Sequence, residues 1–340
     1  MKRHGNLFDQ IVSWDNLVLA FNKARKGKTW QTTVKRIDRN RNRFLGRLQN
    51  DLTQGRFTTS EYKIKQVHEP KTRDIYVLPF YPDRIVQHAM MNVVEPIWKK
   101  MFIKDSYACI AGRGLHAGSR RTMEFVRRYR YCLKCDISKF YPSISHDVLF
   151  SIIERKIKCR RTLRLWEDII YSLPGGKNVP IGNYTSQWLG NLYLNELDQK
   201  AKHDWRARGY VRYCDDFCFF SNSKAVLRDW WAKARAFLWD QLGLSFSKAS
   251  IFPVSQGVDF LGYRHFPNKV LLRKSTAKRV RRRLKALPGA FRRGQVSLEH
   301  YRSSVASSWG WLRWANTQNF QLAIKLHELQ EDIAAHEALQ

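Results

Sequence analysis

The sequence predicts an α+β fold, and three observations support this prediction. Helical and strand patterns are mixed along the 340 residues, without the strict βαβ alternation of a doubly wound sheet. Hydrophobic residues make up 44% of the chain, which is enough for a sizeable core and excludes a disordered chain. Two separate hydrophobic segments, at 131–136 and 212–217, each carry carboxylates, so we expect two neighbouring strands to bring these acids together.

The N-terminal part is predicted to be mostly helical. Apolar residues recur at helical spacing from Leu7 to Phe21, and a further helix is expected at about 44–52. Residues 62–79 predict two strands joined by a turn at 69–72. Helical periodicity returns at 83–102, and a glycine-rich turn then precedes a basic helix that ends near 130.

The central part alternates strands and helices less regularly. A buried strand is expected from residue 131, and Pro142 prevents it from continuing as a central strand. The pattern then predicts one helical stretch at about 146–171, a Gly/Pro loop and a long apolar helix at 185–205. Beyond the hairpin around "RYCDDF", we expect a tryptophan-rich helix, a late strand in "DFLGYRHF" and a basic helical C-terminal region.

The dominant compositional feature is positive charge. The chain has 61 Lys and Arg against 29 Asp and Glu, a formal net charge of +32. Such a surface attracts phosphates and releases their counterions, which predicts a nucleic-acid partner, with an anionic membrane as the alternative. No apolar stretch is long enough to span a membrane and no signal-like segment opens the sequence, so we expect a cytoplasmic protein.

The six cysteines do not form a recognisable metal framework. Cys132 and Cys135 have the CxxC spacing of zinc ligands, but no second pair follows at the expected distance. Their position within a strand-like segment favours reduced, buried thiols.

The acids suggest the chemistry. Asp215 and Asp216 alone could be ordinary solvated or capping acids, but Asp136 also ends an apolar strand. Three carboxylates in one place repel each other unless protons or cations offset the charge. Oxygen ligands select Mg²⁺ or Mn²⁺, and two such ions about 3.5–4 Å apart support in-line phosphoryl displacement. In so basic a chain, this pattern predicts nucleotidyl transfer on a nucleic acid.

The order of motifs from about 69 to 263 closely resembles reverse transcriptases. "CDISKFYPSI" is similar to their first palm motif, and "YCDDF" to their Tyr-x-Asp-Asp box. The resemblance implies a right-hand polymerase with fingers, an antiparallel-sheet palm and a helical thumb. It places N-terminal helices and fingers at 1–130, the palm at 131–266 and the basic thumb at 267–340, with a helical segment on the fingers side at about 146–178.

The resemblance also implies roles for the palm residues. Asp136, Asp215 and Asp216 would be catalytic and would bind two Mg²⁺ ions, or Mn²⁺, together with the carbonyl of Ile137. Tyr141 would lie under the sugar and exclude a 2′-hydroxyl.

Further positions would bind the incoming nucleotide. Lys71 and Arg73 lie where the fingers hairpin of the family grips the triphosphate, and Lys248 is a candidate general acid for pyrophosphate. "DFLGY" resembles the primer-grip region.

One loop indicates a subgroup. "VPIGNYTSQ" has Ile181 where most bacterial reverse transcriptases have Gln, and Gln187 where they have Pro. This block, which includes Gly182, resembles reverse transcriptases of diversity-generating retroelements, and "DRIVQHA", "GLHAG" and "SWGWLRWANTQNF" fit that subgroup. Such enzymes of bacteria, archaea or phages copy a template RNA into cDNA with errors at adenines, using dNTPs and a small, basic, oligomeric accessory protein. Because Ile181 cannot hydrogen-bond as Gln does, it could loosen discrimination at the nascent base pair.

Basic residues supply candidate nucleic-acid contacts. The run "KRVRRRLKAL" is either a solvated face or the thumb surface that tracks template–primer phosphates, and the net charge favours the second interpretation. Its candidate contacts are Lys278, Arg279, Arg281, Arg282 and Arg283. "YACIAGRG" has Ile110 and Ala111 where the family commonly has an Arg-Pro pair, so that contact would be missing or supplied by Arg113.

Two other interpretations remain open. Within the enzyme class, the alternative is a group II intron-like or another cellular or defence reverse transcriptase, although we expect no room for maturase, endonuclease or RNase H regions. In a different class, the chain would be a catalytically idle RNA-binding scaffold. The presence of all three acids favours the enzyme.

Overall fold

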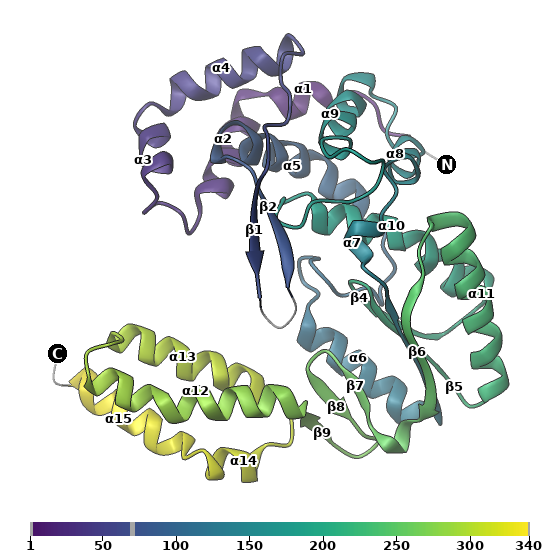
Figure 1. The fold of residues 1–340 in the computed structure, drawn as a ribbon, viewed down its shortest axis with the longest axis vertical. Coiled ribbons are helices and arrows are strands. Elements are labelled where there is room, and N and C mark those ends of the chain that lie inside the picture. Colours follow the sequence, from purple (N-terminus) through teal and green to yellow (C-terminus); the bar gives the residue numbers. More distant parts are fainter. Residues whose placement is uncertain (1–2, 69–71, 339–340) are drawn as a thin grey trace.

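The computed structural model describes residues 3–68 and 72–338. Its N-terminal helices form a layer around α5, above the rest of the molecule in Figure 1. Their bounds are α1 Phe8–Val12, α2 Trp14–Arg25, α3 Thr32–Arg39, α4 Arg41–Thr53 and α5 Ile85–Lys99. The apolar stripe predicted from Leu7 to Phe21 is buried, since Leu7, Ile11, Leu17 and Phe21 belong to the main core.

A two-stranded antiparallel hairpin projects from this helical layer. It pairs β1 (Lys63–Val67) with β2 (Arg73–Val77), and the π-helical turn Phe80–Arg84 then leads into α5. In Figure 1 the hairpin points from the N-terminal helices toward the C-terminal helices.

A four-stranded antiparallel sheet lies at the centre, in the order β4-β5-β3-β6. The strands are β3 Tyr131–Ile137, β4 Gly209–Tyr213, β5 Asp216–Ser221 and β6 Phe246–Pro253. One face joins the main core with α10 (Ser186–Gln199) and α11 (Lys224–Leu242), while the other packs on α6 (Leu115–Arg128). Because side chains alternate along a strand, Leu133 and Cys135 enter the first core and Cys132 enters the second.

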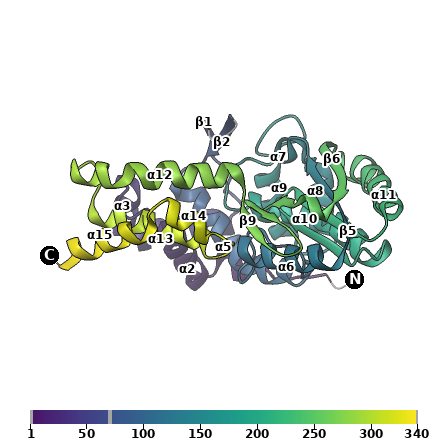
Figure 2. The same ribbon diagram turned by 90° about the horizontal axis from the view of Figure 1, so that it is seen from below.

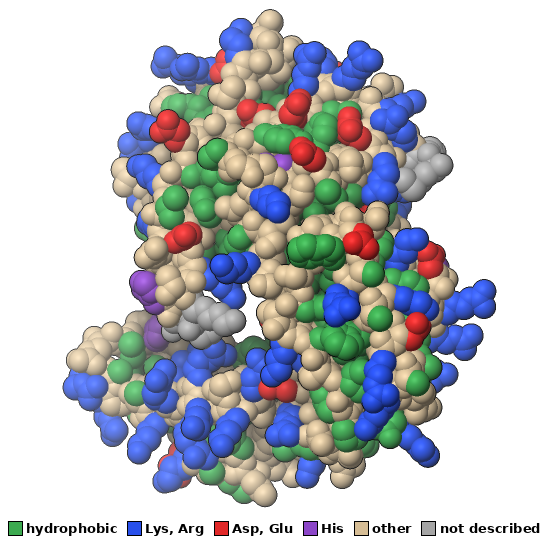
Figure 3. Space-filling view, turned by 45° about the vertical axis from the view of Figure 1, so that its right-hand side comes forward, with side chains coloured by type: hydrophobic (Ala, Val, Ile, Leu, Met, Phe, Trp, Pro, Cys, Tyr) green, Lys and Arg blue, Asp and Glu red, His purple; other side chains and the backbone are tan. Residues whose placement is uncertain are grey.

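A second antiparallel sheet, β7-β8-β9, connects the central sheet to the C-terminal helices. Its short strands are Val258–Phe260, Tyr263–His265 and Val270–Leu272. The helices are α12 Lys274–Arg292, α13 Leu298–Leu312, α14 Gln318–Ala323 and α15 Leu326–Ala338. They enclose a separate core, and Figure 2 shows that they extend to one side of the sheets. Figure 3 shows a recess between this bundle and the upper part of the molecule, with Lys and Arg side chains along its lower side.

The predicted α+β class with antiparallel sheets is confirmed, although strands β6 and β9 were not predicted and other elements differ locally. The single helix expected at 146–171 is two helices, α8 (His146–Glu154) and α9 (Arg160–Ile170), because the chain between them bridges to His4 through Ile157. The single late strand is two strands, separated by a tight turn in which Gly262 has φ of +80°. The sequence prediction also missed α3. None of the helices among the described residues is long and apolar enough to cross a membrane.

Candidate active site

Asp136 lies near the end of β3, on the sheet face opposite the main core. Its neighbour in β6 is Lys248, which stands directly across the antiparallel pair. The Asp136 carboxylate accepts a hydrogen bond of 2.5 Å from the hydroxyl of Ser247. The side chain of Ile137, the next residue, is buried in the main core.

The other two acids lie at the hairpin between β4 and β5. Tyr213 pairs with Asp216 across the hairpin, so Cys214 and Asp215 form its two-residue turn. Cys214 has a left-handed φ of +53°. The turn therefore places Asp215 at the tip and Asp216 at the start of β5, beside the strand that carries Asp136.

A buried arginine holds this turn from below. Arg212 is completely buried in β4, and its guanidinium donates to the carbonyl of Cys214 at 3.0 Å. It also donates to both carboxylate oxygens of buried Asp198 in α10, at 2.8 and 2.6 Å, and to the side-chain oxygen of Asn191 at 3.0 Å. This network was not predicted from the sequence. Its signal was an Arg within the apolar strand "GYVRY" and an Asp within the apolar helix that precedes it.

The three acids influence one another electrostatically. The pKa of Asp216 is raised to about 6, mainly by burial; the positive charge of Lys134 opposes this shift, and the charges of Asp136 and Asp215 add to it. Burial also raises the pKa of Asp215, and Asp136 adds to that effect. A cation would therefore be stabilised at this place, because it offsets like charges in a half-buried site.

The ligands are not preassembled. In the part of the chain that the structure describes, no three His, Cys, Asp or Glu side chains are grouped closely enough to hold a metal ion. Asp136 and Asp216 do line one cleft of about 460 Å³, together with Lys134, Lys248 and Arg273. The donor set suits Mg²⁺ by its chemistry, and the assignment of Asp136, Ile137, Asp215 and Asp216 as metal ligands stays a prediction.

Tyr141 stands beside the acidic turn. It is half-buried in the short helix α7 (Phe140–Ser143) that follows β3. Its ring rests on Gly190 of α10, where an added Cβ would lie 3.2 Å from a ring carbon. Burial raises the pKa of Tyr141, and the Asp215 charge contributes to this shift. The hydroxyl is therefore neutral, and the ring is fixed close to the acids.

The hairpin β1–β2 holds the "VPIGNYTSQ" loop. The backbone N–H of Tyr76 donates to the carbonyl of Ile181 at 2.7 Å. Gly182 has φ of +126°, and a Cβ there would lie 2.3 Å from the carbonyl oxygen of Tyr76, so only glycine fits. On the other side, the backbone N–H of Tyr184 donates to the side-chain oxygen of Gln87 in α5 at 2.9 Å. The "DRIVQHA" segment thus supports this loop, a connection that the sequence did not reveal.

The remaining predicted contacts are distributed around this site. Arg73 is exposed at the start of β2, and its charge lowers the pKa of Asp215, which places it within electrostatic reach of the turn. Gln187 is exposed at the start of α10. Lys71 lies outside the described residues. Arg113 donates to the carbonyls of Ile103 and Ser106, so its guanidinium holds a neighbouring loop.

The basic residues of α12 point away from the core of the bundle. Thr276, Val280, Leu284 and Leu287 form its buried face, which leaves the predicted contacts exposed. These are Lys278, Arg279, Arg281, Arg282 and Arg283. Arg283 also links α12 to α13, since it donates to the carbonyl of Ser304 and the hydroxyl of Ser308.

An antiparallel sheet with acids on two adjacent strands lies next to a projecting hairpin and a basic helical bundle, and this arrangement agrees with the right-hand polymerase fold that the motifs predicted. The profile of the family described as "Reverse transcriptase (RNA-dependent DNA polymerase)" matches residues 64–265, more than half of the chain. The chain belongs to this reverse transcriptase family, which confirms the family that its motifs indicated.

Curated relatives and one solved structure agree with this family. The chain is 28% identical to "Protein YkfC" of Escherichia coli, over 55% of this chain and 61% of that protein. It is 26% identical to the "Group II intron-encoded protein LtrA" of Lactococcus lactis, over 36% of this chain and 22% of that protein. The chain thus spans less than two thirds of the length of these relatives. Telomerase from Candida albicans, solved with a fragment of telomeric RNA, has a similar fold, with a TM-score of 0.50, 11% identity and coverage of 83% of this chain and 64% of that chain.

Proposed function

We propose that this reverse transcriptase extends a DNA primer on an RNA template at Asp136, Asp215 and Asp216. The observation that carries the proposal is the proximity of these acids at the end of β3 and the β4–β5 turn, where the charge of Asp136 raises the pKa of both Asp215 and Asp216. Two bound Mg²⁺ ions would activate the primer 3′-hydroxyl and stabilise the leaving pyrophosphate. Residues 131–266 would act as palm, the helices and hairpin before them as fingers, and 267–340 as thumb.

The other residues would position the substrates. Arg73 would bind the triphosphate from the hairpin, and Lys248, opposite Asp136, would donate a proton to pyrophosphate. Tyr141 would exclude a 2′-hydroxyl, because its ring is held against Gly190 near the acids. The exposed basic face of α12 would follow the phosphates of the hybrid.

We further propose that the chain belongs to a diversity-generating retroelement and copies its template RNA with errors at adenines. The "IGNYTSQ" loop supports this proposal, because Ile181 has no side-chain hydrogen-bonding group and lies in a loop held between Tyr76 and Gln87. The partners would be a structured template RNA, its cDNA and a small, basic, oligomeric accessory protein.

A second candidate is a group II intron-like reverse transcriptase. The observation that favours it is the similarity to an intron-encoded protein of Lactococcus lactis. The two candidates differ in the expected error spectrum, because only the first predicts errors concentrated at template adenines.

Primer extension separates these possibilities. On an RNA template with a DNA primer, the wild-type chain should synthesise cDNA with Mg²⁺, and Asp215→Ala should abolish synthesis while retaining binding to the hybrid. Deep sequencing of the cDNA should show misincorporation at adenines, and Ile181→Gln should reduce it. Unchanged errors in Ile181→Gln would contradict the role of this residue, and uniformly accurate wild-type cDNA would favour the intron-like candidate.

A further inference from the structure

A second cleft lies on the palm, between α11 and the outer strand β6. Its volume is about 580 Å³, and it is distinct from the catalytic cleft although Lys248 lines both. β6 is an edge strand of the central sheet, so this cleft opens to the side of the molecule. Apart from Lys248, no residue that lines this cleft has a role proposed above.

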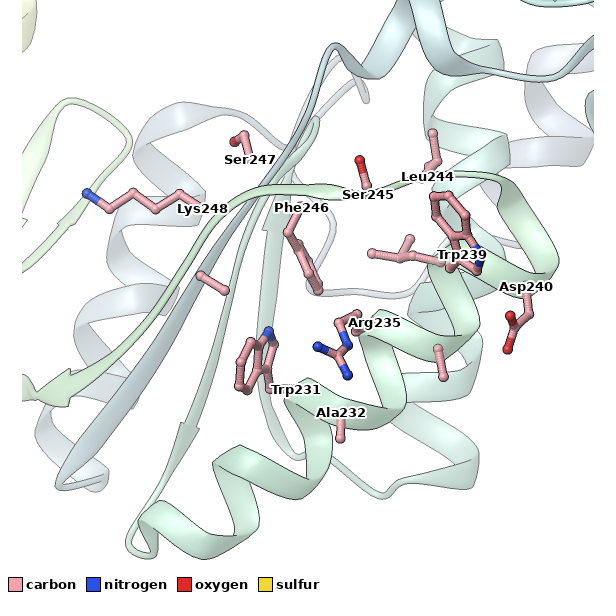
Figure 4. Close-up of a pocket in the computed structure, with 13 residues that line it drawn as sticks. Trp231, Ala232, Arg235, Trp239, Asp240, Leu244, Ser245, Phe246, Ser247 and Lys248 are labelled. Carbon is pink, nitrogen blue, oxygen red and sulfur yellow. The ribbon is translucent and has the colours of Figure 1, made fainter.

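The α11 wall of this cleft carries two tryptophans with an arginine between them. Trp231, Arg235 and Trp239 are four residues apart, so they lie on one face of the helix. Trp231 is 37% exposed and Trp239 is 68% exposed, so both rings are accessible to a ligand. Figure 4 shows this row facing β6, from which the ring of Phe246 points toward α11.

The cation belongs to the same row. The Arg235 guanidinium lies 5.7 Å from the centroid of the Trp231 ring. In Figure 4 it lies beside Trp231 and below Phe246, and Asp240, which also lines the cleft, lies beyond Trp239. The cleft therefore combines aromatic faces with two cations, Arg235 and Lys248, and one acid, Asp240.

The row suits a single-stranded nucleic acid. At a rise of 1.5 Å per residue, eight residues separate the two rings by about 12 Å along the helix. Since stacked bases are only about 3.4 Å apart, each tryptophan would receive its own base, and Arg235 would face the phosphates between them. Base stacking on aromatic rings next to a cation is the usual way in which proteins bind single strands without reading their sequence.

We propose that the α11–β6 cleft binds single-stranded RNA by stacking bases on Trp231 and Trp239. The choice of RNA rests on the proposed function, because a template RNA that is copied in part leaves unpaired RNA next to the enzyme, whereas the new cDNA remains paired. Two observations carry the proposal: the exposed aromatic row with its central cation, and the net charge of +32 of the whole chain. The cleft would hold RNA that flanks the copied segment.

The test measures RNA binding while the catalytic cleft is occupied. The full chain is first saturated with an unlabelled, blunt RNA–DNA hybrid, and a fluorescein-labelled oligouridylate of about 12 nucleotides is then titrated by anisotropy. Trp239→Ala and Trp231→Ala should each weaken oligouridylate binding about tenfold, as expected for one lost base–aromatic stack. Arg235→Gln should weaken oligouridylate binding and reduce the slope of log K against log salt concentration by about 1, because one phosphate contact is lost.

Matched controls come from elsewhere on the chain. Trp30 is 72% exposed and lies outside the cleft, so Trp30→Ala should leave oligouridylate binding unchanged. Arg228 is exposed on α11 but does not line the cleft, so Arg228→Gln controls for the loss of charge. Equal effects of Trp30→Ala and Trp239→Ala would overturn the proposal.

Primer extension by the same preparations keeps the two proposals separate. If the wild-type chain makes no cDNA, the proposed function fails whatever the anisotropy shows. If cDNA synthesis is normal and both tryptophan variants bind oligouridylate like the wild type, only the RNA site is refuted; a protein would then be the candidate occupant of the cleft.

Discussion

Arg212 and Asp198 form a completely buried ion pair directly beneath the turn that carries Asp215. The guanidinium donates to both carboxylate oxygens, at 2.8 and 2.6 Å, and also to the carbonyl of Cys214 in the turn. The hydroxyl of Tyr210 donates to the same carboxylate at 2.7 Å. The pair therefore connects the acidic turn to α10, and the position of Asp215 depends on two charges that never reach solvent.

Breaking this pair should destabilise the fold strongly. Arg212→Met leaves the Asp198 carboxylate buried without its cation, which should cost about 3–5 kcal/mol of unfolding free energy. The double variant Arg212→Met/Asp198→Leu should recover part of that loss, because no buried charge is left unpaired. Urea denaturation followed by circular dichroism measures both values. The exposed pair Lys233–Asp229 is the control, and Lys233→Met should cost less than about 1 kcal/mol.

Asp216 should lower the stability of the metal-free fold above neutral pH. Because its folded-state pKa is about 6, above the ordinary 3.8, the folded chain binds a proton more tightly than the unfolded chain does. The stability of the wild type should therefore rise as pH falls from about 7 to about 4. Asp216→Asn removes this pH dependence. In EDTA, the free energy of unfolding of this variant should exceed that of the wild type by no more than about 3 kcal/mol at pH 8, and the two should be almost equal at pH 4.

Urea denaturation at several pH values tests this expectation. The exposed carboxylate of Asp240 supplies the control. At every pH, the free energy of unfolding of Asp240→Asn should stay within about 0.5 kcal/mol of the wild-type value. An Asp216→Asn variant that is less stable than the wild type at pH 8 would show that the carboxylate is favourably paired in the fold. Mg²⁺ should raise the melting temperature of the wild type more than that of Asp216→Asn.

Gly182 should be required for the geometry of the nucleotide loop. In Gly182→Ala the new Cβ would collide with the carbonyl of Tyr76 and would also occupy a strained positive φ. We expect a loss of at least about tenfold in kcat/KM for dNTPs, because small misplacements near the reacting groups are costly. Gly46→Ala is the matched control, since a Cβ at this site in α4 meets nothing within 4 Å. Equal steady-state rates for both variants would show that the loop tolerates displacement.

The positions of the three acids could be predicted from the sequence, whereas the contacts that support them could not. Asp136, Asp215 and Asp216 follow directly from acids at the ends of apolar strands, since strand periodicity and local turn signals are short-range information. The contacts of Arg212 with Asp198, and of Gln87 and Tyr76 with the "IGNYTSQ" loop, join segments far apart in the chain. Periodicity contains no information about such pairs. The prediction of a single helix at 146–171 was wrong for a related reason. The chain between the two observed helices pairs with the distant N-terminus, through the bridge of Ile157 to His4.

Tyr141 supplies the last prediction, which concerns the choice of sugar. Its ring is held between the acidic turn and Gly190, and burial keeps its hydroxyl neutral, so the bulk of the ring rather than a charge would act on the substrate. Tyr141→Val should therefore lower the preference for dNTPs over rNTPs by roughly ten- to a hundredfold, as measured by single-nucleotide incorporation. Tyr141→Phe keeps the ring and should retain the preference. If Tyr141→Phe admits ribonucleotides as readily as Tyr141→Val does, the hydroxyl rather than the ring is responsible for the discrimination.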